Sequence, residues 1–400
     1  MKKLIVLLAA LALLLTMVVG CNKPEPAPSQ PAPSAPAQTG SSAPSNEPIK
    51  IGYLNPLTGD TALWGQTGLN GLILAAEQIN AAGGILGRTV EIVGLDNRDS
   101  TEDTLIAFNR LIDEYKVIAV VGTNTSTHNI AMAPIANQRK IPIIGTGTTN
   151  ELVTVDENGN LHPYSFRLSF IDSFQGTKMG EYAIKQGMKT AAFITNIADS
   201  YSTGCTEYTS KAFEAGGGKV VAQENANAGD TDYRAQLTRI APKNPDVLFI
   251  PENYQHVAYI ARQARELGLT CAFYGYDGWD SVELPEMADG ALEGARFASR
   301  PGFSLPEAEQ FGKDYIARFN DTQLEAESLF TADALYWIKQ CLEAAGVVDS
   351  VALRDQMENT TSFKGLMGEM IIDPKTHNPA RELAIFEIQG KDNVLIEIFY

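Results

Sequence analysis

Two short turns rich in hydroxyl groups offer the first binding chemistry in this chain. The segments 122–127 (GTNTST) and 145–150 (GTGTTN) each follow an apolar run that predicts a buried strand. Ser126, Thr146 and Thr148 lie in these turns, where backbone N–H groups stay unpaired and a following helix favours an anion. Neutral donors can share the charge of a carboxylate, at about 1.5–3 kcal/mol for each hydrogen bond. For any one of these residues, the alternative is a helix cap or a turn closure.

An acidic residue among aromatic residues offers a second kind of binding chemistry. Asp277 follows another predicted strand, within YGYDGW (274–279), and Tyr201 and Tyr254 follow two more. A carboxylate surrounded by aromatic rings suits an ammonium group, because the rings add about 0.5–2 kcal/mol of cation–π attraction. Trp64, in a wide loop after the first strand of the body, is a third aromatic candidate. The alternatives are an ordinary turn at Asp277 and core packing of the aromatic residues.

The elements that must position these residues alternate strand and helix in two series. The first series has strands at 49–54, 90–95, 117–121 and 141–144, with helices at 66–82, 102–115 and 129–138. The second has strands beginning near 190, 220, 247 and 272, with helices at 203–215, 233–240 and 255–267. Further helices are predicted at 305–320, 329–345 and 351–358. This alternation predicts an α/β fold of two doubly wound parallel-sheet lobes, whose ligands bind beyond the carboxyl ends of the strands.

The N-terminal segment predicts export and lipid anchoring. Residues 1–20 have a positive start and an apolar run that falls short of the ~20 residues needed to cross a bilayer, as in a signal peptide. Cys21 completes VVGC, which looks like a lipobox and makes this cysteine the predicted lipidation site; an uncleaved anchor is the alternative. The rest of 21–48 is mostly Pro, Ala and Ser, a composition typical of an extended tether. We therefore expect an extracytoplasmic protein that meets the membrane through its lipid only.

Composition and spacing argue against several function classes. The net charge of −17 disfavours nucleic acid and anionic lipid headgroups as partners. The four histidines show no metal-ligand spacing, and none stands beside a nucleophile motif, so neither a metal, a cofactor nor an enzyme is predicted. Cys205, Cys271 and Cys341 are expected to be free thiols, because the predicted elements place them too far apart to form a disulfide.

Residues 52–65 and 79–88 resemble the opening of the branched-chain amino-acid-binding proteins, a branch of the type I periplasmic binding proteins. The first segment fits G-x-x-x-x-x-T/S-G-x-x-x-x-W/Y-G, and the second is INAAGGILGR. The resemblance runs from about Ile49 to the C-terminus and implies a hinge of three chain crossings between the lobes. Placing these near 168, 298 and 363 gives an N-terminal lobe of 49–168 plus 299–362 and a C-terminal lobe of 169–298 plus 363–400.

The resemblance also assigns roles to the candidate residues. Hydroxyls and backbone amides of the first lobe hold an α-carboxylate in that family, and an acid of the second lobe holds the α-amino group. The matching positions are Ser126 and Thr148 for the hydroxyls, Thr146 for a backbone contact, Asp277 for the acid, and Trp64, Tyr201 and Tyr254 for the cleft aromatics. Family members often carry a disulfide between the region matching 96–100 and the Ser126 loop. This chain has no cysteine there, so packing and hydrogen bonds must hold the loop.

The function implied is that of a substrate-binding lipoprotein of an ABC importer. A monomer would bind an amino acid, branched-chain or aliphatic, by hinge closure and deliver it to the permease subunits in the membrane. An amide, urea or aromatic acid remains open as ligand, and so does a sensory receptor role on the same fold. Tyr276 is a further aromatic candidate, Phe330 a weaker one, and the acids Asp277, Asp280 and Glu283 leave a basic amino acid open.

Overall fold

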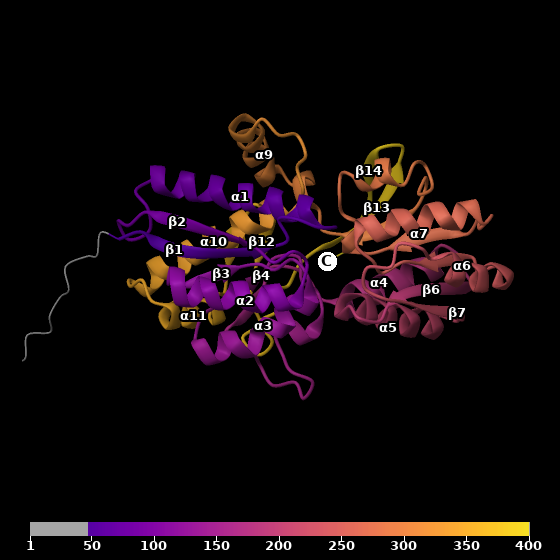
Figure 1. Cartoon of the computed structure of the whole chain (residues 1–400), viewed down its shortest axis with the longest axis horizontal. Coiled ribbons are helices and arrows are strands. Elements are labelled where there is room, and N and C mark those ends of the chain that lie inside the picture. Colours follow the sequence, from indigo (N-terminus) through magenta and orange to yellow (C-terminus); the bar gives the residue numbers. More distant parts are fainter. Residues whose placement is uncertain (1–46, 400) are drawn as a thin grey trace, which may run out of the picture. The chain divides into compact units, whose positions relative to one another are not determined.

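Two β-sheets organise the part of the chain that the structure, a computed structural model, describes: residues 47–399 (Figure 1). We call each sheet, with the helices packed on it, a lobe. The predicted signal peptide, Cys21 and nearly all of the tether lie outside the described residues.

The first lobe is built on a parallel five-stranded sheet of order β2-β1-β3-β4-β5. Its strands are β1 (Ile49–Asn55), β2 (Val90–Asp96), β3 (Ala119–Val121), β4 (Ile143–Gly145) and β5 (Ser165–Arg167). Its helices are α1 (Ala62–Ala81), α2 (Thr101–Arg110, continued by a π-helical turn, Leu111–Tyr115), α3 (Ser126–Arg139), α9 (Pro306–Phe319), α10 (Glu327–Ala345) and α11 (Ser350–Glu358). Val120 packs in a core with α2 and α3, whereas its neighbours Ala119 and Val121 pack in a core with α1 and α10. Both faces of the sheet are therefore buried, which explains the continuous apolar runs in the sequence.

The second lobe is built on a seven-stranded sheet of order β14-β13-β10-β9-β8-β6-β7. Its strands are β6 (Thr190–Asn196), β7 (Lys219–Ala226), β8 (Val247–Phe249), β9 (Ala272–Gly275), β10 (Arg296–Ser299), β13 (Leu383–Gln389) and β14 (Asp392–Phe399). Its helices are α4 (Asp172–Lys185), α5 (Ser200–Ala215), α6 (Arg234–Ile240), α7 (Tyr254–Glu266) and α8 (Leu284–Met287). The α/β fold of two doubly wound lobes is confirmed, but β13 and β14 pair antiparallel, so this sheet is mixed rather than wholly parallel. The short strand β5, the helix α4 and all strands after β9 have no counterpart among the predicted elements.

Both sheets contain the same doubly wound core, which fixes where a ligand can bind. The order β2-β1-β3-β4-β5 of the first lobe recurs as β7-β6-β8-β9-β10 in the second. In each case the strand order reverses beside the first strand of the series, and a crevice opens there beyond the carboxyl ends of the strands. The residues after β1 and β3 in the first lobe, and after β6 and β8 in the second, are thereby selected as the walls of a site.

The chain passes between the two lobes three times, and the third passage differs from our prediction. Leu168 packs in the first core and Phe170 in the second, and the chain returns to the first lobe after Ala298. The passage expected near Phe363 is wrong. Phe363 and Met370 lie in two short paired strands, β11 (Phe363–Gly365) and β12 (Gly368–Met370), and both pack in the core of the first lobe. The chain joins the second sheet only at β13.

Close packing of α1 on α10 places the start of α10 at the cleft. A Cβ atom built on Gly71 would lie 2.2 Å from the carbonyl oxygen of Ser328, so this close approach needs glycine. The Thr331 hydroxyl donates to the Gly68 carbonyl oxygen at 2.7 Å across the same contact. The first residue of α10, Glu327, is held beside the end of β1 as a result.

We expect Gly71→Ala to lower the free energy of unfolding by about 1–3 kcal/mol, because the added methyl group meets helix backbone that cannot move alone. Gly94→Ala is the matched control. Its Cβ would first meet a Leu69 methyl group at 3.2 Å, and that side chain can rotate. Urea unfolding of both variants measures the difference, and equal losses would contradict the role of the helix contact.

Candidate functional site

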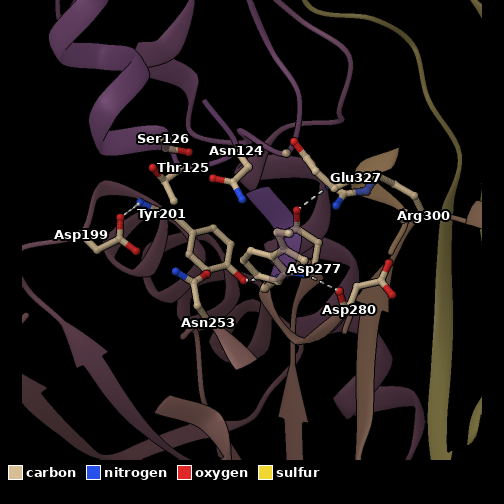
Figure 2. A pocket seen from close by; sticks show the side chains of 14 residues that line it. Asn124, Thr125, Ser126, Asp199, Tyr201, Asn253, Asp277, Asp280, Arg300 and Glu327 are labelled. Carbon is tan, nitrogen blue, oxygen red and sulfur yellow. Dashed lines mark hydrogen bonds and ion pairs between the residues drawn. The ribbon is translucent and has the colours of Figure 1, made fainter. Parts of the chain in front are cut away.

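A cleft of about 500 Å³, part of it open to solvent, lies between the carboxyl ends of the two sheets (Figure 2). Its walls are Trp64, Asn124, Thr125, Ser126, Gly147, Asp199, Tyr201, Asn253, Asp277, Gly278, Asp280, Arg300, Ala326 and Glu327. Four of the seven residues predicted from the sequence therefore line the cleft: Trp64, Ser126, Tyr201 and Asp277.

Ser126 is positioned to donate a hydrogen bond into the cleft. It is the first residue of α3, and its hydroxyl oxygen accepts from the backbone N–H groups of Thr149 (3.2 Å) and Asn150 (3.1 Å). Because the oxygen is already used as an acceptor, the hydroxyl proton remains available. No acidic residue lies in the first turn of α3, so the positive end of its dipole adds to this donor.

Thr146 and Thr148 are buried just beside the cleft but do not line it. The Thr146 hydroxyl is committed to the carboxylate of Glu327. The Thr148 hydroxyl has no hydrogen-bond partner in the described structure. A buried hydroxyl without a partner carries a desolvation cost, so Thr148 has a donor that a bound group can use.

Asp277 is not the solitary acid that the sequence suggested. Its Oδ2 pairs with Nη1 of Arg300 at 2.7 Å, and both side chains are more than 90% buried. Its Oδ1 is buried and has no partner. Burial raises the pKa of Asp277, whereas Arg300 lowers it. One oxygen of this carboxylate is therefore held by the protein, and the other is left for a ligand.

The aromatic residues contribute in different ways. The Trp64 indole N–H donates to the carbonyl oxygen of Asp280 at 3.0 Å, which joins the first lobe to the second. Tyr254 packs edge-on against Trp64 with ring centroids 4.9 Å apart and supports it from behind. The Tyr201 hydroxyl accepts from the Gly278 N–H at 2.9 Å, which holds the turn after Asp277. Tyr276 is fully buried, and its hydroxyl donates to Thr209 rather than facing the cleft.

A polar network on the first lobe includes residues that sequence analysis missed. Asn55 ends β1; its Oδ1 accepts from the Asn124 N–H at 2.7 Å, and its Nδ2 lies 3.4 Å from Oε1 of Glu327. Burial raises the pKa of Glu327 to about 7. Asn55 and Asn124 could have been found from the sequence, because they lie at the ends of β1 and β3, where ligands bind. No such indication pointed to Glu327, because it begins a helix far along the chain.

The Ser126 loop is held by hydrogen bonds, as its lack of cysteine required. Nδ1 of the buried His128 lies 2.6 Å from the Thr125 hydroxyl and 3.3 Å from the Asn97 amide nitrogen. Burial lowers the pKa of His128 to about 4, so the ring is neutral near pH 7 and Nδ1 accepts from both groups. The cysteines 205, 271 and 341 are free, which confirms the expectation from the sequence.

Hydrogen bonds join the rims of the two lobes around the cleft. The Thr127 hydroxyl donates to Oδ1 of Asp199 at 2.9 Å, and the Asn150 amide donates to the Ser200 carbonyl oxygen at 2.7 Å. On another side, Oε1 of Glu325 accepts from the Ser281 hydroxyl at 2.9 Å. Burial raises the pKa of Glu325 to about 8.

Residues 47–399 carry neither a metal-binding cluster nor a membrane-spanning helix. They contain no cluster of three His, Cys, Asp or Glu side chains arranged to hold a metal ion. Within the same residues, no helix combines the length and apolar character needed to span a bilayer.

Comparison with known proteins gives the class to which this fold and cleft belong. The sequence model of the periplasmic binding protein family matches residues 48–393. The chain belongs to this family, in the type I fold shared with branched-chain amino-acid-binding proteins, whose members act outside the cytoplasm. The relatives named below are substrate-binding proteins rather than enzymes.

Relatives and solved structures cover nearly the whole folded body. An amino acid binding protein of Pseudomonas aeruginosa is 27% identical over 86% of this chain and 91% of its own. A leucine-binding protein from Thermotoga maritima superposes with a TM-score of 0.81 at 30% identity, over 88% of this chain and 98% of the other. A branched-chain amino acid transporter substrate-binding protein from Streptococcus pneumoniae, solved with isoleucine, has a TM-score of 0.79 at 28% identity, over 88% and 99%.

The raised pKa values of Glu325 and Glu327 predict that the ligand-free protein loses stability as pH rises. In the folded state both carboxyls hold their protons to a higher pH than in the unfolded chain. The two protonated carboxyls therefore contribute fully to the free energy of unfolding below about pH 4.5. This contribution is lost as pH rises through about 7 for Glu327 and through about 8 for Glu325. At about 1.4 kcal/mol per pKa unit, we expect the two carboxyls together to give a fall on the order of 6 kcal/mol between pH 5 and pH 8.5. Glu325→Gln should reduce that fall, and the exposed Glu214→Gln should not. Urea unfolding at the two pH values measures it, and equal falls in wild type and Glu325→Gln would refute the assignment.

Proposed function

We propose that this protein captures a free α-amino acid in the cleft between its lobes and presents it to the membrane subunits of an ABC importer. The observation that carries the proposal is the pairing of opposite chemistries across the cleft. The first lobe presents the proton of Ser126 at the start of α3, and the second lobe presents an unpaired, buried oxygen of Asp277. An amino acid carries a carboxylate for the first and an ammonium for the second, about 2.5 Å apart along its backbone, an order-of-magnitude figure from standard bond lengths.

The carboxylate of the amino acid suits the first lobe, and its ammonium group suits the second. Hydrogen bonds to a carboxylate contribute about 1.5–3 kcal/mol each, and the donors at Ser126 and Thr148 are neutral, so no cation is needed there. An ammonium group at Asp277 completes a charge pair in a site shielded from water, where electrostatic attraction is stronger than at the surface. The Tyr201 ring, which lines the same cleft, supplies a face for the cation.

Binding would be coupled to closure of the lobes. The hydrogen bonds at Thr127–Asp199 and Trp64–Asp280 join residues of different lobes, so they exist only when the lobes are together. A ligand that touches both walls favours that arrangement by its differential affinity for it. The closed surface is the form that a permease would recognise.

Ligands without an ammonium group fit this cleft less well. An amide, urea or aromatic acid leaves the free oxygen of Asp277 unpaired and buried, which costs about 1–3 kcal/mol. A solute-binding protein from Rhodopseudomonas palustris solved with benzoate shares the fold at 22% identity, which says nothing of the ligand here. A sensory role is disfavoured by the relatives, two of which are Leu/Ile/Val-binding protein homologues of Brucella melitensis and Brucella suis.

We further propose that the mature protein is a monomer anchored by a lipid on Cys21 and carried on the tether of residues 22–48. The sequence supports this through the lipobox-like VVGC and the Pro/Ala/Ser composition. Metabolic labelling with a fatty acid, lost on Cys21→Ser, tests the anchor; labelling that persists in the variant would exclude Cys21.

We predict that Asp277→Ala weakens amino-acid binding by about 2–5 kcal/mol, because the ammonium and Arg300 both lose their partner. Asp277→Asn keeps an oxygen beside Arg300 but removes the charge, so its loss should be smaller. Asp232→Asn, on the surface of the same lobe, is the control. Isothermal titration calorimetry with the full chain gives the affinities. Asp277 leaves the site if the Asp277→Ala variant binds like wild type while remaining folded.

Thr148→Val separates ligand binding from folding. Its hydroxyl has no partner in the protein, so replacing it with a methyl group of similar shape should leave thermal stability unchanged or raise it. The same change should weaken amino-acid binding by about 1.5–3 kcal/mol if the hydroxyl turns to the carboxylate. An unchanged affinity would mean that Ser126 and the backbone hold the carboxylate without it.

A further inference from the structure

The cleft wall beyond the zwitterion clamp is polar. Among its fourteen lining residues, alanine is the largest aliphatic side chain, at Ala326, and the large carbon surfaces are the rings of Trp64 and Tyr201. A pocket for leucine, isoleucine or valine gains its affinity from apolar contact, at about 0.8 kcal/mol per buried CH₂. This wall offers little of that contact.

Asn124 presents an unused amide to the cleft. Only 8% of this residue is exposed, and neither its Oδ1 nor its Nδ2 has a hydrogen-bond partner. Figure 2 shows the side chain directed into the cavity from the segment that follows β3. Each buried polar atom that lacks a hydrogen-bond partner costs about 1–3 kcal/mol of stability, and this amide has two such atoms. A ligand carrying a polar group removes that cost, whereas an aliphatic one makes it permanent.

Glu327 lies on the same wall, where burial raises its pKa and the charge of Arg300 lowers it without forming an ion pair with the carboxylate. Asn55 connects the two residues, since it bonds the backbone of Asn124 and the carboxylate of Glu327. Arg300 extends between Glu327 and Asp277 in Figure 2, but its ion pair is with Asp277. No Lys, Arg or His nitrogen in residues 47–399 lies within 4 Å of the Glu327 carboxylate, although the residue is 94% buried.

The charges that line the cleft are unbalanced. Four acidic residues line it, Asp199, Asp277, Asp280 and Glu327, and Arg300 is the one cation among the lining residues. A zwitterion adds no net charge and leaves this excess in place. The cleft also shares Thr125, Asp199 and Asn253 with a wider cavity, whose walls include the acids Asp60, Asp99 and Glu252, the cation Arg98 and two histidines, so that acids still outnumber cations there. An acidic approach of this kind attracts cations.

We propose that the ligand is an amino acid whose side chain ends in a cationic group, which is received by Glu327 and by the amide oxygen of Asn124. The inference rests on the amino-acid-binding function proposed above and narrows its ligand class. The α-carboxylate and α-ammonium go to Ser126 and Asp277, and the second cation goes to the wall of Asn55, Asn124 and Glu327. An aliphatic amino acid would satisfy the clamp but leave this wall unpaired.

The test is a calorimetric ranking of L-arginine, L-lysine, L-glutamine and L-leucine with the full chain at pH 7.5, after mass spectrometry of the solute that denaturation releases. We expect arginine or lysine to bind at least tenfold more tightly than leucine and glutamine. Tightest binding of leucine overturns the cationic ligand and keeps the amino-acid function. Tightest binding of glutamine does the same and indicates a neutral polar ligand. If none of the four binds to protein that is free of released solute, the amino-acid function itself fails.

Variants test whether Glu327 and Asn124 cause the preference for a cationic side chain. Glu327→Gln should reduce the ratio of arginine or lysine affinity to leucine affinity at least tenfold. Glu343→Gln is the control: it removes an exposed acid from the same helix, α10, that does not line the cleft, and should leave the ratio unchanged. Asn124→Ala breaks no side-chain hydrogen bond within the protein and should lower the ratio at least threefold, which keeps the test open if Glu327→Gln does not fold. An unchanged ratio in both folded variants would refute the assignment.

Discussion

The buried ion pair of Asp277 and Arg300 is the constraint on which the cleft depends. Arg300 stands where the chain leaves β10 for the first lobe, and its Nη1 also donates to Ser169, in the first passage between the lobes, at 2.8 Å. Its guanidinium lies over the Phe330 ring of α10 at 4.5 Å and the Phe170 ring of the second lobe at 5.6 Å. One side chain thus links the acid of the clamp, two chain passages and both lobes. Removing one partner of such a pair costs about 3–5 kcal/mol, because the other charge is left buried.

The same pair accounts for the orientation that we propose for the ligand. Arginine would attract a carboxylate if it were free, but its charge is balanced by Asp277, so the carboxylate is directed to neutral donors elsewhere. Several helices begin at the cleft, and acids already occupy two of these starts: Asp199 caps α5, and Glu327 lies in the first turn of α10. The start of α3 carries no acid and presents Ser126. Two helix starts without an acid therefore remain for an anion: that of α3 on the first lobe, opposite Asp277, and that of α7 on the second lobe, after Asn253.

The sequence predicted the frame of this site, meaning the strand ends and helix starts around it, better than its contents, meaning the side chains that line it. Alternating apolar and turn-forming segments located β3, β6 and β9, and the rule that ligands bind beyond strand ends then selected Ser126, Tyr201 and Asp277. The third passage between lobes was misplaced because β11 and β12 are three-residue strands whose apolar residues resemble the start of a longer strand. Arg300 and Glu327 were missed for a different reason. Their roles come from a chain passage and from helix packing, which bring together residues separated by 23 positions (Arg300 and Asp277) and by 272 (Glu327 and Asn55).

This division between frame and contents also explains why family membership does not settle the ligand. The clamp uses strand ends and helix starts, which the doubly wound topology places in the same positions whatever the side chains are. The wall is set instead by how closely α10 approaches α1, where Gly68 and Gly71 let the helix start reach the end of β1. At that point Glu327 presents a carboxylate held by Thr146 and Asn55. Glu327 has these two hydrogen bonds and the charge of Arg300 nearby but no ion pair, and burial still raises its pKa, which favours a protonated carboxyl or a carboxylate joined by a further cation. Its pKa near 7 places the folded protein between these two conditions, so that a cationic ligand and a proton compete for the same group.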